Sequence, residues 1–330
     1  MPNIILITTD QQRFDTLGCM GNPVIRTPNL DRLASRGLLY RNGYSPCPVC
    51  VPARTSLITG LAPGRLQPSR PEAVDNGTTM AQGTVTIPPK LSGAGYHTEM
   101  IGKQHTWPLD EPHGFSHRVL SEETRMYRFG QRTGAESLDD YDRYLDERGL
   151  LGYDKPPEIG YNEIKPLVSP LREEDHVTTW CANETIRFLE NAPSEPFFLW
   201  SSFVKPHVPY DPPLGWHDRY DPAELPPRVT TCAGENPLYE HSVRHHDWWQ
   251  YSEEAWQLSR AYYYGVIEHI DHHVGRILDT IDALGMWHDT LIVFTSDHGD
   301  LMGDHGMWYK GLPYEGSMHV PLIVKPPGVG

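Results

Sequence analysis

Long apolar segments are scarce in this sequence, which excludes the usual ways of inserting a protein into a membrane. No apolar run approaches the ~20 residues that a membrane-spanning helix requires. Near the N-terminus the apolar run covers only Ile4–Ile7, and no basic segment precedes it, so no secretory signal peptide is recognised. We therefore expect no membrane partner and a cytoplasmic location, or a periplasmic or secreted one if a signal was removed.

Positive charge is also scarce. The 28 Lys and Arg residues are outnumbered by 43 Asp and Glu residues, which gives a formal net charge of −15. Proteins that bind nucleic acid usually carry a basic face, so nucleic acid is excluded as the expected partner. Only seven of the 330 residues are lysines, and any cluster of basic side chains in a pocket must therefore be a local feature of that pocket.

Cysteine is the third scarce residue, and its pattern excludes a disulfide framework. The five cysteines are odd in number and irregularly spaced. Cys47 and Cys50 form a C-x-x-C pair, which can be a redox pair or half of a zinc site. The isolated Cys19, Cys181 and Cys232 supply no second pair of zinc ligands. A buried cysteine without chemistry is a further interpretation of Cys50.

The rest of the chain alternates short apolar strands with helical patterns. The predicted strands are Asn3–Thr9, Leu38–Arg41, Tyr96–Ile101, Pro196–Ser202, Thr290–Ser296 and Val320–Val324. The predicted helices are Thr27–Gly37, a segment that begins near Cys50, Ile87–Ala94, Leu138–Arg148, Glu173–Asn191 and Ser252–Leu284. This alternation predicts an α/β fold with a mostly parallel sheet and helices on both faces. We expect one large domain over 1–330, with insertion loops near 106–170 and 211–250.

Unusual polar residues follow several predicted strands directly. They are Asp10-Gln11, Lys103–His105, His207 and Asp297-His298. Ligands of parallel sheets bind outside the carboxyl ends of the strands, so we expect these side chains to meet. Either aspartate alone could be a turn residue, but two at equivalent strand ends favour a divalent cation. Oxygen ligands suit Ca²⁺, Mg²⁺ or Mn²⁺, and a histidine ligand favours Mn²⁺ or another transition metal.

The segment around Cys50 predicts an anion-binding site. Pro52 suits the first turn of a helix, and Gly60 suits the position just past its end. Cys50 then lies at the helix N-terminus, where free N–H groups and the helix dipole favour an anion. Arg54 follows about one turn later on the same face. A reactive side chain, a helix N-terminus and an arginine together suit a tetrahedral oxyanion.

The pentapeptide Cys50-Val-Pro-Ala-Arg54, followed by Thr59-Gly60, resembles the signature of the sulfatase family. Further segments occur in the order expected of sulfatases and span almost the whole chain. They are Asp10-Gln11, Gly102-Lys103-x-His105, Lys205-Pro-His207-x-Pro-Tyr210, Ser296-Asp297-His298-Gly299 and Gly303-Asp-His-Gly-x-Trp-x-Lys310. The resemblance implies the alkaline-phosphatase-like α/β fold and a sulfatase catalytic domain.

The resemblance also implies the site residues and cofactors. A formylglycine-generating enzyme would convert Cys50 to formylglycine, and one divalent cation would bind beside it, with Ca²⁺ as the first expectation and Mn²⁺ or Mg²⁺ as alternatives. The implied cation ligands are Asp10, Gln11, residue 50, Asp297 and His298. The implied catalytic residues are Cys50, Arg54, Lys103, His105, His207 and Lys310. The implied substrate-binding residues are Asn76, Lys103, His207 and Lys310.

The implied reaction is hydrolysis of a small-molecule or saccharide sulfate monoester to an alcohol and inorganic sulfate. One hydroxyl of the formylglycine hydrate would attack sulfur, and Asp297 would accept its proton. The cation and Arg54 would hold the nonbridging oxygens, and His207 or Lys310 would protonate the leaving oxygen. We expect the loss of Lys103 or Lys310 to reduce activity without changing thermal stability, because no core packing is lost.

Two departures from the common sulfatase pattern keep alternatives open. Gln11 stands where many sulfatases have a second acid, and His298 stands where many have Asn. Both forms occur in the subgroup that includes phosphonate monoester hydrolases, so hydrolysis of phosphonate monoesters or phosphodiesters at the same site is an alternative. A non-catalytic anion-binding protein with unmodified Cys50 is another. Family members usually continue into a small C-terminal domain that this sequence does not include, and a homo-oligomer remains open.

Overall fold

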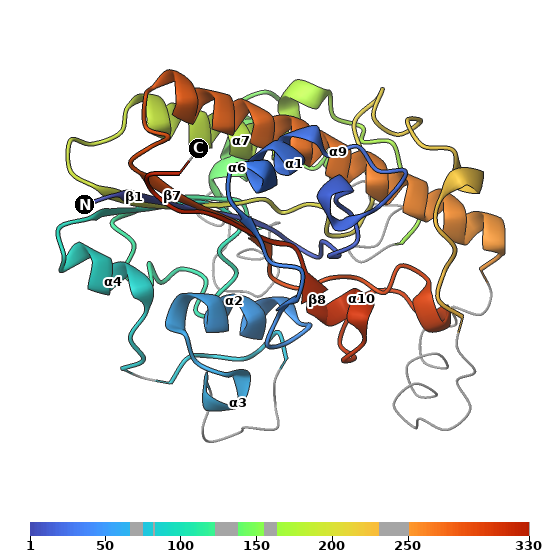
Figure 1. The fold of residues 1–330 in the computed structure, drawn as a ribbon, viewed down its shortest axis with the longest axis horizontal. Helices are drawn as coiled ribbons and strands as arrows, with labels where there is room; N and C mark the ends of the chain where they lie inside the picture. Colours follow the sequence, from blue (N-terminus) through green and yellow to red (C-terminus); the bar gives the residue numbers. More distant parts are fainter. Residues whose placement is uncertain (67–74, 82, 123–137, 155–163, 231–250, 330) are drawn as a thin grey trace.

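The computed structural model describes residues 1–66, 75–81, 83–122, 138–154, 164–230 and 251–329 (Figure 1). A seven-stranded sheet with the order β2-β9-β7-β1-β6-β4-β5 divides the molecule into two layers of helices. Its strands are β1 (Asn3–Thr9), β2 (Leu38–Leu39), β4 (His97–Gly102), β5 (His117–Leu120), β6 (Phe197–Ser202), β7 (Thr290–Ser296) and β9 (Leu322–Lys325). The five strands from β7 to β5 in this order are parallel, whereas β9 and β2 are antiparallel to their neighbours. The predicted α/β fold with a mostly parallel sheet is confirmed.

Helices cover both faces of the sheet, as the sequence predicts (Figure 1). One layer holds α1 (Pro28–Ser35), α6 (Asp140–Asp146), α7 (Val177–Glu190) and α9 (Glu253–Ala283). The other holds α2 (Cys50–Thr59), α3 (Pro63–Leu66) and α4 (Ile87–Ser92). The short α10 (Glu315–Met318) lies near α2 in Figure 1. Among the described residues, 3-10 turns occupy Gly18–Met20, Glu173–Asp175, Pro222–Glu224 and Asp304–Gly306.

The main core lies between the sheet and α9. This helix begins at the side chain of Ser252, which accepts a hydrogen bond from the N–H of Ala255. Apolar residues then recur every three or four positions, so one continuous stripe faces the sheet. The stripe includes Val266, Ile270, Val274, Ile277 and Ile281, all of which are fully buried. Among the described residues, no helix is both long enough and apolar enough to cross a bilayer.

Two predicted elements differ from the structure. The predicted strand Val320–Val324 is two strands, because Pro321 has no N–H to continue a ladder. One of them, β8 (His319–Val320), pairs with β3 (Gly43–Tyr44) in a separate two-stranded sheet, while β9 joins the main sheet. The predicted insertion 106–170 contains the edge strand β5, which the sequence analysis missed. Parts of both predicted insertions, 123–137, 155–163 and 231–250, lie outside the described residues.

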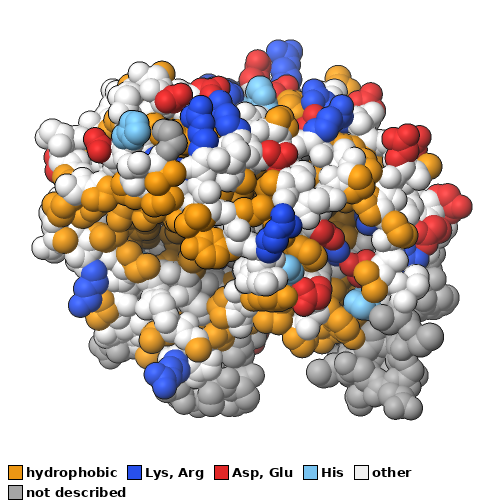
Figure 2. All heavy atoms as spheres, in the orientation of Figure 1, with side chains coloured by type: hydrophobic (Ala, Val, Ile, Leu, Met, Phe, Trp, Pro, Cys, Tyr) orange, Lys and Arg blue, Asp and Glu red, His pale blue; other side chains and the backbone are white. Residues whose placement is uncertain are grey.

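Charged side chains of both signs alternate over the face shown in Figure 2, so the described residues form no continuous basic surface there. This mixed surface agrees with the acidic composition. Inside the protein, the fully buried side chains of Arg54 and Lys103 both lie against Asp10.

A buried histidine pair lies between α7 and α9. The Nε2 atom of His273 lies 2.9 Å from Nε2 of His269 and 3.0 Å from the hydroxyl of Thr179. Arg276 donates to Nδ1 of His273 at 3.0 Å, which requires the neutral form of the ring. Burial, and then the charge of Arg276, lower the pKa of His273 to about 3.

This pair predicts that acid weakens the fold. Because the folded pKa of His273 is about 3 and its ordinary value is 6.5, the stabilisation is complete above pH 6.5 and is lost as the pH falls toward 3. The free energy of unfolding in urea should therefore fall less steeply between pH 7.5 and pH 5 in His273→Gln than in wild type. His288 is exposed and provides the control. The free energy of unfolding of His288→Gln should change with pH as steeply as that of wild type. Equal slopes in all three proteins would contradict the prediction.

Candidate active site

The neighbouring parallel strands β1 and β7 bring two aspartates together. Thr9 is in register with Ser296, so Asp10 and Asp297 are the next residues of adjacent strands. The N–H of Asp297 donates to the carbonyl of Thr9 at 3.2 Å, and the Ser296 hydroxyl accepts from Gln12 at 2.9 Å. These hydrogen bonds hold both strand ends in place, as expected for a site at the carboxyl edge of a parallel sheet.

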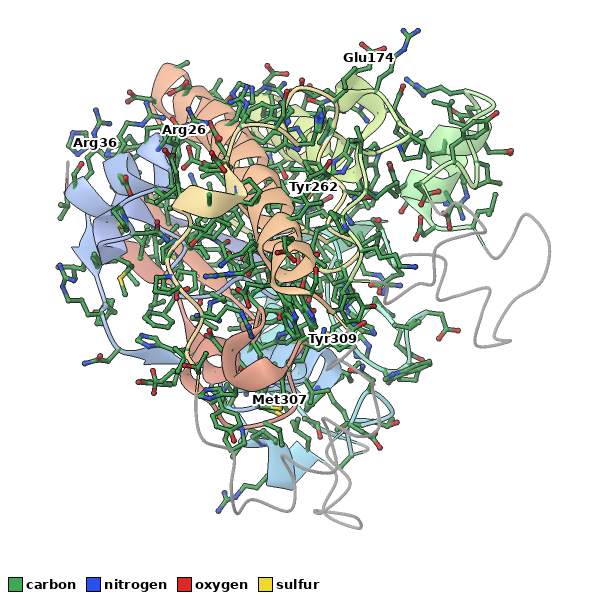
Figure 3. All side chains as sticks on the ribbon, turned by 90° about the vertical axis from the view of Figure 1, so that its right-hand side faces the viewer. Arg26, Arg36, Glu174, Tyr262, Met307 and Tyr309 are labelled. Carbon is green, nitrogen blue, oxygen red and sulfur yellow. The ribbon has the colours of Figure 1, made fainter. Side chains whose placement is uncertain are left out.

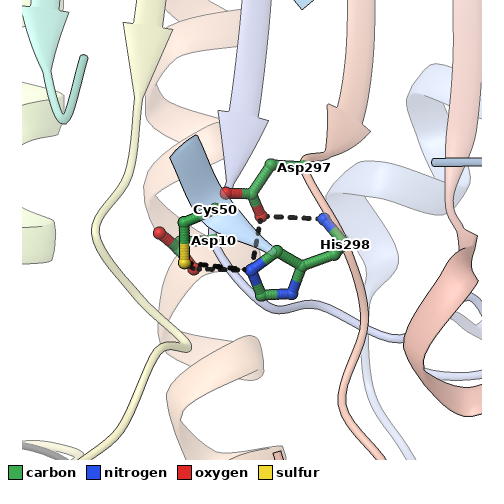
Figure 4. A group of neighbouring side chains, drawn as sticks. All are labelled: Asp10, Cys50, Asp297 and His298. Atoms are coloured by element: carbon green, nitrogen blue, oxygen red, sulfur yellow. Dashed lines mark hydrogen bonds and ion pairs between the residues drawn. The ribbon is translucent and has the colours of Figure 1, made fainter. Parts of the chain in front are cut away.

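Helix α2 supplies the third component, Cys50, at its first residue (Figure 4). Gly60 ends the helix in the left-handed conformation, with φ of 70°, as the sequence predicts. The Cys50 sulfur lies 3.1 Å from Nε2 of His298 and 3.8 Å from Oδ1 of Asp10. Cys50 is 1% exposed, so this contact is sealed from solvent.

Four ligand atoms form a group that fits a metal ion. One atom each from Asp10, Cys50, Asp297 and His298 lie within 4.8 Å of one another, and all four residues are buried (Figure 4). Nδ1 of His298 lies 2.8 Å from the carbonyl of Gly299, so this nitrogen carries the proton and the lone pair of Nε2 faces the carboxylates. Two carboxylates and an oriented imidazole are suitable ligands for a divalent cation.

The electrostatics of the group also favour a cation. Burial opposes the ionisation of Asp10, but Lys103, His207 and Arg54 outweigh it and hold the pKa of Asp10 well below its usual range. Burial and the charge of Asp10 raise the pKa of Asp297. Burial lowers the pKa of His298, but Asp297 and Cys50 outweigh burial and raise it overall. Negative charge in the group thus raises the pKa of both Asp297 and His298, and a bound divalent cation would offset that negative charge.

Arg54 is bonded to the aspartates. Its Nε lies 2.7 Å from Asp297 and its Nη2 lies 3.3 Å from Asp10, while Nη1 donates to the Ser202 hydroxyl and to the carbonyl of Lys103. The side chain is fully buried. We expected Arg54 to hold the nonbridging oxygens of sulfate. In this structure its Nε and Nη2 donate to the two carboxylates, and the expected contact with sulfate stays a prediction.

The two lysines of the site differ in their surroundings. Lys103 is fully buried at the end of β4, and its ammonium lies 2.6 Å from Oδ2 of Asp10. Lys310 is half-buried and donates to Oε1 of Gln11. It is carried by the segment between β7 and α10, which also contains Met307 and Tyr309 (Figure 3). Within that segment the N–H of Leu301 donates to the carbonyl of Tyr309 at 2.6 Å. This hydrogen bond closes the segment into a loop that carries Lys310 next to Gln11.

Both predicted histidines lie next to the group. The side chain of His105 hydrogen-bonds with Cys50, and the backbone N–H of His105 donates to the carboxylate of Glu122 at 2.8 Å. His207 is buried, and its Nδ1 lies 2.9 Å from the carbonyl of Val208. Its charge is among those that lower the pKa of Asp10, so it lies near that carboxylate.

The thiol of Cys50 is acidified by its neighbours. Burial and the charge of Asp10 raise its pKa, but Lys310, His298 and His105 outweigh them, so that the pKa falls well below its usual value. The sulfur is therefore poised as an anion or a metal ligand. Cys47, in contrast, has a pKa raised to about 11, mainly by burial, and both residues are free cysteines. The redox pair, which was only one alternative interpretation of this C-x-x-C, is not present as a disulfide in the structure.

Asn76 has a different environment from the other predicted residues. It is exposed, and its side-chain oxygen accepts a hydrogen bond from the N–H of Val51 at 3.2 Å. It therefore caps the first turn of α2 beside Cys50. The structure brings the remaining predicted residues together around Asp10.

Sequence analysis missed one buried acid that lies beside the metal group. Asp300 is fully buried, three positions after Asp297, and its carboxylate accepts hydrogen bonds from Gln11 and Tyr210. The predicted motif stopped at Gly299, although a second acid directly after it is visible in the sequence.

Comparison with known proteins agrees with this geometry. The sulfatase family profile matches residues 2–330. An arylsulfatase of Clostridium perfringens is 36% identical over 99% of this chain and 69% of its own length. A choline-sulfatase of Rhizobium meliloti is 32% identical over 99% of this chain and 63% of its own length.

Among solved structures, the phosphonate monoester hydrolase of Agrobacterium radiobacter superposes with a TM-score of 0.81 at 28% identity, covering 99% of this chain and 68% of that one. The chain thus spans about two thirds of the length of these relatives. The motifs, the sheet and the profile agree: this chain belongs to the sulfatase family.

Proposed function

We propose that this chain hydrolyses sulfate monoesters to an alcohol and inorganic sulfate. The observation that carries this proposal is the position of Cys50, whose sulfur lies at a helix N-terminus within a buried group of two aspartates and a histidine. Family membership supports it, as do the sulfatase names of the two relatives. The proposed substrates are small-molecule or saccharide sulfate esters.

We further propose that Cys50 is converted to formylglycine by a formylglycine-generating enzyme, and that the cation is Ca²⁺, with Mn²⁺ or Mg²⁺ as alternatives. When present, these groups would supply the attacking hydroxyl and the charge that polarises the ester. Asp10, Asp297 and His298 would hold the cation, together with residue 50 and Oε1 of Gln11. Their buried positions exclude bulk water, which strengthens each electrostatic contact.

The surrounding side chains would move protons and balance charge. Asp297 has a raised pKa and adjoins residue 50, so it can take a proton from the nucleophile. His207 donates Nδ1–H to Val208, so a proton for the leaving oxygen would be carried at its Nε2. Lys310 is half-buried beside Gln11 and can pair with the sulfate oxygens, while Lys103 and Arg54 keep Asp10 ionised.

A second candidate is the hydrolysis of phosphonate monoesters or phosphodiesters. It is favoured by the neutral Gln11 beside Asp10 and by the structural likeness to a phosphonate monoester hydrolase. An aryl sulfate, an aryl phosphate diester and an aryl phosphonate monoester should be compared in one assay. We expect the highest kcat/KM for the sulfate, and a higher value for either phosphorus ester would make the second candidate the main activity.

Removal of divalent cations should abolish hydrolysis and lower Tm. Without a cation, the buried carboxylates of Asp10 and Asp297 repel each other, and binding to the folded state alone raises stability. Activity and thermal unfolding should be measured after chelation and after separate addition of Ca²⁺, Mn²⁺ and Mg²⁺. The Tm of Asp10→Asn should not respond to the chelator. Full activity in protein that elemental analysis shows to be metal-free would contradict the prediction.

A further inference from the structure

Gln11 differs from the other side chains of the site because its two ends are chemically different. An ionised carboxylate offers only oxygen acceptors, whereas an amide has one oxygen that can bind a cation and one NH₂ group that cannot. Gln11 is fully buried, so water cannot compensate for a wrong orientation. Some neighbouring group must therefore decide which end of this amide faces the group formed by Asp10, Asp297 and His298.

Asp300 is that neighbour on one side. Its Oδ2 accepts a hydrogen bond from Nε2 of Gln11, and its Oδ1 accepts one from the N–H of Met302 at 2.8 Å. A carboxylate only accepts, so the NH₂ end of Gln11 must lie toward Asp300. On the other side lies the ammonium of Lys310, which only donates and contacts Oε1. Both neighbours therefore require the same orientation of the amide.

Asp300 is itself held firmly. The hydroxyl of Tyr210 donates to its Oδ2 at 2.8 Å, and Arg13 donates to its backbone carbonyl at 2.9 Å. The rings of Tyr263 and Trp308 pack beside Tyr210, so this hydroxyl has a fixed position. The Tyr263 hydroxyl in turn donates to the carbonyl of Gln11 at 2.7 Å. Backbone and amide of Gln11 are thus fixed by one connected network.

We propose that Asp300, supported by Tyr210, is a positioning residue that directs Oε1 of Gln11 toward the cation site. This inference rests on the proposed function, because it concerns the metal of that same site. Asp300 does not touch the reacting atoms and acts only through Gln11.

The test exchanges donor and acceptor within the pair. In Asp300→Asn the new amide has only one oxygen, so it cannot accept from both Gln11 and Met302. In one orientation its NH₂ group faces the NH₂ group of Gln11, and in the other it faces the N–H of Met302. Affinity for Ca²⁺ and Mn²⁺, measured by competition with a chelating dye, should fall roughly 10- to 100-fold. In the double variant Gln11→Glu/Asp300→Asn the polarity of the contact is reversed. Its carboxylate offers only oxygens to the cation, so affinity should recover at least about tenfold over Asp300→Asn.

Two controls separate positioning from simple destabilisation. Asp304→Asn alters another buried acid of the same segment, which pairs with Arg13 and does not contact Gln11. Its affinity should not improve when Gln11→Glu is added. Should Asp300→Asn not fold, the comparison of Gln11→Glu with the double variant remains, because the single variant brings two carboxylates into contact and should bind more weakly.

The proposal is overturned if Asp300→Asn binds the metal as tightly as wild type, or if Gln11→Glu does not rescue it. It is also overturned if unaltered protein binds neither cation. Metal affinity alone judges the positioning of Gln11, whereas turnover of sulfate esters judges the proposed function. A chain with the expected affinity pattern that cleaves no sulfate ester would refute the function and leave the positioning intact.

Discussion

Replacing Cys50 with alanine should abolish ester hydrolysis while leaving the fold intact. The residue supplies the nucleophile and one atom of the metal group, so the expected loss is roughly 10⁶-fold, the scale seen when a catalytic nucleophile is removed. Its sulfur fills little of the core, and the first turn of α2 is held by Asn76 and by Arg54. Steady-state kinetics with an aryl sulfate and thermal unfolding should be measured together.

Cys47→Ala is the matched control, because Cys47 is buried three residues earlier and lies outside the metal group. It should retain activity. Mass spectrometry of the peptide that contains Cys50 adds an independent measurement, since conversion to formylglycine lowers its mass by about 18 Da. Activity of Cys50→Ala within tenfold of wild type would refute the nucleophile, and an unconverted peptide in active enzyme would refute formylglycine.

Lys103→Ala and Lys310→Ala should both lower kcat/KM by roughly 10²-fold or more, the scale of one lost charge-stabilising donor. Their thermal stabilities should differ, however. Lys310 is half-buried and pairs with a neutral amide, so its loss should leave Tm nearly unchanged. Lys103 is fully buried against Asp10, and its removal leaves a buried carboxylate short of compensation, at a cost of about 3–5 kcal/mol for such broken pairs.

The exposed Lys90 provides the surface control, and Lys90→Ala should match wild type in kinetics and in Tm. Equal kinetics of all three variants would refute the assignment of this pocket to a sulfate ester. The sequence-based expectation of unchanged stability for both lysines is thus revised for Lys103. Sequence can assign a lysine to a strand end, but it cannot show how deeply the side chain is buried there.

The elements that were predicted correctly from the sequence are those whose signals lie within a few neighbouring residues. Helix α2 was predicted with its end because Gly60 is a strong local signal, and the strands β1, β6 and β7 are apolar runs bounded by polar residues. The edge strand β5 was missed because it is only four residues long and includes His117 and Arg118. Such a strand has no periodic pattern, and only its pairing with β4 reveals it.

The site was predicted as a set of residues, but its internal bonding was not. Strand-end placement brought Asp10, Lys103 and Asp297 to one location. It could not show that Arg54 contacts the aspartates, because that depends on how α2 packs against the strand ends. Nor could it identify Asp300, whose contact with Gln11 joins residues 289 positions apart.

The order of strands in the sheet has a consequence for the timing of maturation. The strand β1 is central and pairs with β6 and β7, both of which come much later in the chain, at Ser202 and Ser296 among others. Contacts so distant in sequence form late. Until β7 has been synthesised, Asp297 and His298 cannot cover Cys50. The sulfur that is sealed in the folded protein is thus uncovered until then, and the proposed conversion of Cys50 would have to precede the closing of the sheet.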